Sequence, residues 1–263
     1  MDGHVEEAVE YAQLAMRSAE LLDDMPSVAC LAVSFGMKRI VLIEGILPVV
    51  HLLPAGSNLT AIEQVLDGLQ PRAHQLSAFL GERAFVNRLY DLLRRDMNAL
   101  DGLELVSSFR ARVVRAALDH DQADYLEEWA LAVHASRRPP WDPAWRALEG
   151  DVLMEPRPHR YYNLISLMVL PPAHRSGEWT AKLEARCLLT RAAILARREG
   201  AQAAGEWIAT QTDPFVGRPL RWRIDADGLM VLWSAGANRV DDGGTIGDSE
   251  EPPLDEVVRV RPR

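Results

Sequence analysis

The sequence has little of several residue types, and each shortage excludes a class of protein. Its 263 residues include only two cysteines, Cys30 and Cys187, too few for a disulfide scaffold or for a zinc site built from thiolates. Acidic residues outnumber Lys and Arg by 38 to 29, and no run of basic residues is longer than a pair. We therefore expect no nucleic-acid partner, because a chain of net charge −9 repels phosphate backbones.

Long hydrophobic runs are also missing. The longest apolar stretch, residues 28–53, is interrupted by Lys38, Arg39 and Glu44, whereas a helical membrane span needs about 20 nearly uninterrupted apolar residues. Acidic residues follow Met1 where a secretory signal would have a basic and then an apolar segment. Contact with a membrane is therefore expected only through an N-terminal anchor that this chain lacks.

The remaining composition is that of a globular protein, with 48% hydrophobic and 25% charged residues. Over most of the first two hundred residues, apolar side chains recur at helical spacing between proline and glycine breaks. The sequence 60–63 (TAIE) predicts a capping box, and Asp142 before Pro143 predicts a helix start. We expect separate helices over 71–80 and 82–100, the second with Phe85, Leu89, Leu92 and Leu93 on one face.

The character of the chain changes from Asp213 onward. Two short runs of β-type residues, 220–224 and 229–233, flank the turn sequence 225–228 (DADG), and a third follows at 257–260. The predicted fold class is α+β, mainly α: a multi-helix body followed by a small C-terminal antiparallel β-sheet with an acidic loop. We place the helical body at residues 1–205 and the β module at residues 206–263.

Almost all of the net negative charge lies in this C-terminal part. Residues 225–256 contain nine acidic residues and one base, Arg239, so their net charge is −8 of the chain's −9. An acidic loop with Gly243 and Gly244 at its centre either stays solvated or folds around a cation. Calcium is the natural cation, because it takes six to eight carboxylate and carbonyl oxygens in irregular geometry.

Several short motifs occur in a fixed order in this region. They are 213–223 (DPFVGRPLRWR), 227–228 (DG), 232–236 (LWSAG), 241–244 (DDGG) and 255–258 (DEVV). The order resembles the C-terminal segment of type II secretion major pseudopilins, in which an acidic loop after the hairpin binds calcium. Carried over by position, the resemblance implies four candidate ligands: the Leu232 carbonyl, the side chain of Asp241 or Asp242, and that of Asp255. The sequence departs from the family at Asn238, where Asp is common, and at Pro252-Pro253, which lengthen the loop.

The helical part is similar to that of uncharacterised bacterial envelope proteins with the same pseudopilin-like end. This resemblance implies a periplasmic or cell-envelope location and contact with protein partners. Those relatives normally carry an N-terminal membrane helix, so either this sequence begins after that anchor or this version is soluble. Because pseudopilins need this helix to polymerise, assembly into a pseudopilus does not follow from the resemblance.

Catalytic motifs are missing from the sequence. It contains no Gly-x-Ser-x-Gly elbow, no His-Glu-x-x-His and no phosphate-binding glycine loop. The leading hypothesis is therefore a non-enzymatic interaction protein. The alternative is a small-ligand binder or hydrolase-type enzyme with a site in a cleft between helices, near Trp141, Trp145 and His159. Cys30 and Cys187 are expected to be packed in helices, and whether they pair stays open.

Overall fold

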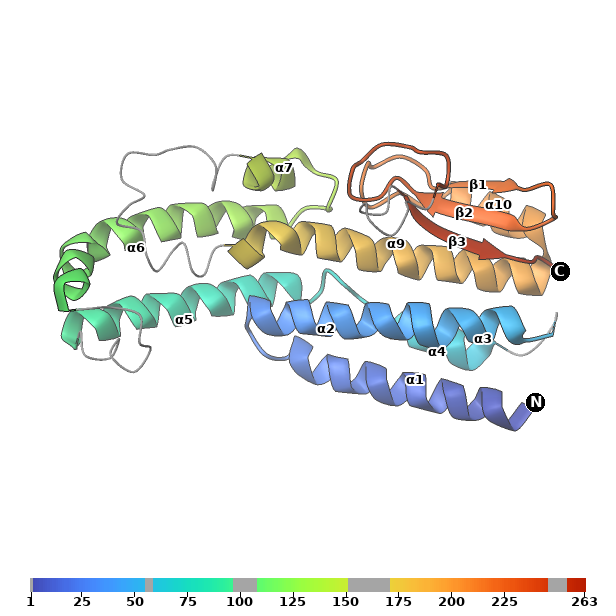
Figure 1. Ribbon diagram of the computed structural model, residues 1–263, viewed down its shortest axis with the longest axis horizontal. Helices are drawn as coiled ribbons and strands as arrows, with labels where there is room; N and C mark the ends of the chain where they lie inside the picture. Colours follow the sequence, from blue (N-terminus) through green and yellow to red (C-terminus); the bar gives the residue numbers. More distant parts are fainter. Residues whose placement is uncertain (1, 55–58, 97–107, 151–170, 246–254) are drawn as a thin grey trace. The chain divides into compact units, whose positions relative to one another are not determined.

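The protein is described here from a computed structural model that defines residues 2–54, 59–96, 108–150, 171–245 and 255–263. The chain is mainly helical and ends in a small three-stranded antiparallel sheet (Figure 1). The predicted fold class, α+β and mainly α, is confirmed. No helix among the described residues is long and apolar enough to cross a membrane.

The chain divides into two compact units. Unit 1 comprises Met1–Asp24, Ala32–Arg72 and Glu178–Arg263, and unit 2 comprises Met25–Leu31 and Ala73–Gly177. The sheet therefore belongs to the same unit as the first helix. The boundary predicted between residues 205 and 206 falls within helix α10 (Ala201–Ala209).

The N-terminal part of the chain supplies helices to unit 1. They are α1 (Asp2–Asp23), α2 (Val28–Ile40), the π-helix η1 (Val41–Ile46), α3 (Leu47–Leu52) and α4 (Thr60–Gly68). The first residues of α2 belong to unit 2. A buried ion pair between Asp23 and Lys38 joins α1 to α2, and the Asp23 carboxylate also accepts a hydrogen bond from the Ser34 hydroxyl at 2.6 Å. This pairing satisfies a buried lysine that would otherwise be costly to desolvate.

Unit 2 contains α5 (Gln75–Arg95), α6 (Ser108–Ser136) and α7 (Pro143–Gly150). Its core is a continuous series of aromatic rings with centroids 5.3 to 6.3 Å apart. The rings are those of Tyr90, Tyr125, Trp129, Phe79 and Trp145, and all are almost fully buried. Such edge and offset contacts add to the large apolar area that each ring buries.

Three local predictions for the helices have different outcomes. Asp142 caps α7 as predicted, since its carboxylate accepts a hydrogen bond from the Ala144 backbone N–H at 2.9 Å. The predicted break near Gly81 is wrong, because α5 runs through it without interruption. The capping box is also wrong: within the described residues no side chain caps α4, and Glu63 pairs instead with Arg198.

The predicted core face of α5 is also largely wrong. Phe85 and Leu92 are exposed and Leu89 is half-buried. Leu93 is buried as predicted, together with Val86 and Tyr90. The two sets of apolar residues lie on neighbouring faces of the same helix, and packing against α6 selects the second one.

The sheet consists of β1 (Arg221–Ile224), β2 (Met230–Ser234) and β3 (Glu256–Val260), in the order β1-β2-β3. All of β2 is buried. The sheet packs on α9 (Pro171–Glu199), where the Arg186 guanidinium donates a hydrogen bond to the Val257 carbonyl at 2.8 Å. On β1, the Trp222 ring packs so closely on Gly205 of α10 that an added Cβ there would lie 2.3 Å from the ring.

Candidate functional site

Asp213 fixes the corner at which the chain enters the sheet. Its carboxylate is fully buried and accepts hydrogen bonds from the Phe215 N–H at 2.9 Å, the Ser234 hydroxyl at 2.7 Å and the Ala235 N–H at 2.9 Å. The first bond is the Asx turn that an aspartate before proline favours. The other two bonds hold the end of β2, from which the acidic loop starts.

The described part of the acidic loop is pinned by a second buried carboxylate, that of Asp255. Its two oxygens face the backbone N–H groups of Gly244 at 2.7 Å and Asp242 at 3.4 Å, and its exposed fraction is 2%. Burial raises the pKa of Asp255 above its ordinary value, and the charge of Asp242 raises it further. Asp255 thus joins the start of β3 to the glycine pair.

Asp241 points elsewhere, toward the face of the sheet. Its carboxylate accepts hydrogen bonds from the Trp233 indole N–H at 2.8 Å and from the Gly243 N–H at 3.2 Å, and it pairs with the Arg221 guanidinium at 3.0 Å. The bond from Trp233 is the main cause that lowers the pKa of Asp241. Adjacent residues in the DDGG motif therefore have different partners.

Two arginines of β1 hold this loop against the sheet. Arg221 pairs with Asp241, while Arg223 donates a hydrogen bond to the Gly243 carbonyl and lies over the Trp233 ring at 5.3 Å. Such a cation–π contact is worth about 0.5–1 kcal/mol at an exposed site. Neither arginine is among the site residues predicted from the sequence. Their alternate spacing, which places both on one face of a strand, was the available signal.

The four ligands implied by the resemblance are therefore only partly brought together. Asp242 and Asp255 are adjacent, and the Asn238 amide donates a hydrogen bond to the Asp242 carboxylate at 2.7 Å. Asp241 belongs to the arginine pair described above, and Leu232 lies in the buried middle of β2, paired with Trp222 and Val258.

A calcium ion needs six to eight oxygen ligands. Among the described residues, no group of three or more His, Cys, Asp or Glu side chains could hold a metal ion. The Asp242–Asp255 pair supplies two carboxylates, and their oxygens retain lone pairs beside the N–H groups that they accept from. The further acidic residues of the loop, Asp248, Glu250 and Glu251, lie outside the described residues. The described residues thus supply fewer oxygen ligands than calcium requires.

Glu256, next to Asp255, connects this region to the helices of unit 1. Its buried carboxylate lies 2.6 Å from Nε of Arg186 on α9 and 3.6 Å from the Arg39 guanidinium on α2. The two consecutive carboxylates therefore have different partners. Asp255 accepts hydrogen bonds from the loop backbone, and Glu256 pairs with arginines of α9 and α2.

The cleft predicted near Trp141, Trp145 and His159 is not tested by the described residues. Trp145 is buried against Gly177, where an added Cβ would lie 2.6 Å from its ring, and His159 lies outside the described residues. A groove of about 430 Å³ does lie in unit 1, between α4, α9 and α10. Its charged groups pair across it, Arg198 with Glu63 at 2.6 Å and Arg191 with Asp67 at 2.9 Å.

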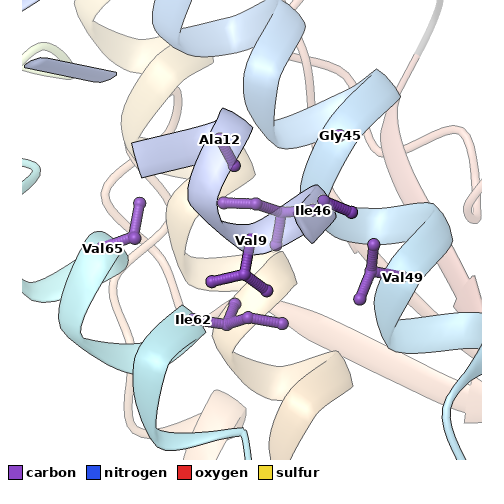
Figure 2. Close-up of a pocket in the computed structure, with 8 residues that line it drawn as sticks. Val9, Ala12, Gly45, Ile46, Val49, Ile62 and Val65 are labelled. Atoms are coloured by element: carbon purple, nitrogen blue, oxygen red, sulfur yellow. The ribbon is translucent and has the colours of Figure 1, made fainter. Parts of the chain in front are cut away.

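A second hollow lies between α1, η1, α3 and α4, and Figure 2 shows aliphatic side chains from these helices pointing into it. Its empty volume is about 210 Å³, yet it is too narrow to admit a water molecule. Such a crevice is a packing defect rather than a ligand site. Gly45 is one of the residues that line it.

Comparison with known proteins gives no relative from which a role could be transferred: no protein-family profile, curated protein or solved structure matches this chain.

Proposed function

We propose that this chain is a non-enzymatic interaction protein of the cell envelope whose C-terminal β module carries an acidic loop ordered by calcium. The observation that carries the proposal is the Asp255 carboxylate, buried and bound to the backbone N–H groups of Asp242 and Gly244. This contact holds the backbone of Asp242 against the Asp255 carboxylate, and the charge of Asp242 raises the pKa of Asp255. Two neighbouring negative charges repel each other, and a divalent cation between them removes that repulsion.

The surrounding contacts support a loop that is prepared for a cation. Arg221, Arg223 and Trp233 fix its first half on the sheet, and Asp213 fixes the point from which it starts. A ligand set of this kind loses little conformational freedom when the ion binds. The envelope location and the protein partners are supported by the resemblance of the C-terminal segment to pseudopilins.

A thermal melt of the full chain in calcium and in EDTA tests the calcium part of the proposal. A ligand that binds only the folded state at 100 times its Kd stabilises it by about 2.7 kcal/mol. We expect calcium to raise the Tm and to protect the C-terminal module from proteolysis. Magnesium should do so less, because it demands a more regular octahedral geometry.

Two variants localise the effect. Asp242→Asn should abolish the calcium-dependent rise in Tm. Asp227→Asn, in the exposed hairpin turn, should retain it, although it changes the charge equally. The calcium proposal fails if the wild-type chain melts at the same temperature in both conditions, or if Asp242→Asn responds to calcium as the wild-type chain does.

A further inference from the structure

One face of α1 carries large apolar side chains on the surface of unit 1. Tyr11, Leu14 and Leu21 are 64%, 61% and 72% exposed. The opposite face is buried through Ala12, Met16 and Ala19, and α1 packs there on η1 and α4. Because the helix already has its own core face, the exposed residues contribute nothing to the packing of unit 1.

The spacing of this outer face is that of a helix–helix seam. Tyr11, Leu14, Ser18 and Leu21 are separated by three, four and three residues, which is the a/d pattern of a coiled coil. Two such positions per heptad form a narrow apolar stripe that a second helix covers. Binding to a flat membrane surface or to an extended peptide does not require this a/d spacing.

The charges beside the stripe identify the kind of helix that would cover it. Exposed acidic residues lie at or beside the stripe at Glu7, Glu10 and, just after the helix, Asp24, and Arg17 is the one exposed base among residues 7–24. A second copy of α1 would place like charges against each other, and anionic lipids would be repelled in the same way. A partner helix with lysine or arginine beside its apolar face would be attracted.

We infer that the outer face of α1, formed by Tyr11, Leu14 and Leu21, is a docking site for a basic amphipathic helix of a partner protein. The inference rests on the proposed interaction function and names its partner class. It does not depend on calcium, so the titration below is carried out in EDTA and its outcome is independent of the melt described above.

The probe is a fluorescent synthetic peptide of leucine and lysine in helical heptads, about five turns long. Fluorescence anisotropy with the full chain should show binding that weakens between about 50 mM and about 300 mM salt. A leucine–glutamate peptide of the same pattern should bind at least about ten-fold more weakly. Replacing both leucines, Leu14→Gln with Leu21→Gln, should weaken binding of the lysine peptide at least about ten-fold.

The matched control is Phe85→Gln with Leu92→Gln, which removes an exposed apolar pair from α5. It should leave binding unchanged, and circular dichroism should show that both double variants keep the wild-type helix content. Three results would overturn the inference. They are equal binding by the Leu14/Leu21 variant, a dimer in light scattering that this variant abolishes, and co-sedimentation with phosphatidylglycerol vesicles that it abolishes.

Discussion

Glu82, in the middle of α5, caps a different helix. Its Oε2 atom accepts a hydrogen bond from the backbone N–H of Val28, the first residue of α2, at 3.1 Å. Separate helices over 71–80 and 82–100, as predicted from the sequence, would place Glu82 near the positive end of its own helix dipole. The carboxylate does lie at the positive end of a helix dipole, but the helix is α2 rather than its own.

Gly81, the residue before Glu82, should not tolerate a side chain. Gly81 packs directly on Pro26, and an added Cβ would lie 2.1 Å from the Pro26 Cβ and 2.3 Å from its carbonyl oxygen. Because backbone cannot move aside cheaply, we expect Gly81→Ala to lower the free energy of unfolding by about 3 kcal/mol. Glu82→Ala should cost about 1 kcal/mol through loss of the cap. Urea denaturation measures both, and similar losses for the two variants would contradict the close-contact argument.

Two other helical glycines should behave in the opposite way. An added Cβ at Gly36 meets nothing within 4 Å, and at Gly45 it would make only an ordinary contact of 3.8 Å with Val41. Alanine is favoured over glycine in a helix by about 1 kcal/mol. Gly36→Ala and Gly45→Ala should therefore each raise the urea midpoint. A loss of stability in Gly45→Ala alone would mean that the π-helix requires glycine.

The sheet was predictable because its signals are local. The turn 225–228 and the runs of β-type residues on each side set β1 and β2 to within a residue, and β3 follows from the run 257–260. The contacts between the β1 arginines and the acidic loop were not predictable, because they depend on the register in which β1 pairs with β2. Arg221 and Arg223 reach the loop only because Arg221 pairs with Trp233 across β1 and β2. In α5, both Leu92 and Leu93 fit an amphipathic helix, and only contact with α6 decides which is buried.

The corner at Asp213 should contribute more to stability than any exposed carboxylate of the module. Three donors surround its buried oxygens, and an amide at this position would turn an N–H₂ group toward at least one of them. We expect Asp213→Asn to lower the free energy of unfolding by about 2–3 kcal/mol. The control is Asp227→Asn, which alters one exposed turn and should cost less than about 1 kcal/mol. Equal effects would show that the corner does not hold the sheet.

Alkaline pH should destabilise unit 2 through its tyrosines. Burial raises the pKa of Tyr90 and of Tyr125 well above the ordinary value, because both phenols lie in the aromatic core. The folded state therefore favours the neutral phenol, so its stability is intact below about pH 10 and falls as the pH rises above it. Tyr125→Phe should reduce this dependence. Phenolate absorbance at 295 nm should appear for these residues only with unfolding, and earlier ionisation would contradict the prediction.

The two cysteines should differ sharply in reactivity. Both are free thiols, with Cys30 half-buried and Cys187 only 7% exposed. Burial raises the pKa of the Cys187 thiol to about 12, so it carries almost no thiolate at about pH 8. We therefore expect a thiol reagent such as DTNB to modify one site in the folded chain and two in urea. In Cys30→Ser, labelling of the folded chain should disappear while labelling in urea persists. Rapid modification of Cys187 in that variant would show that α9 is far more accessible than its packing indicates.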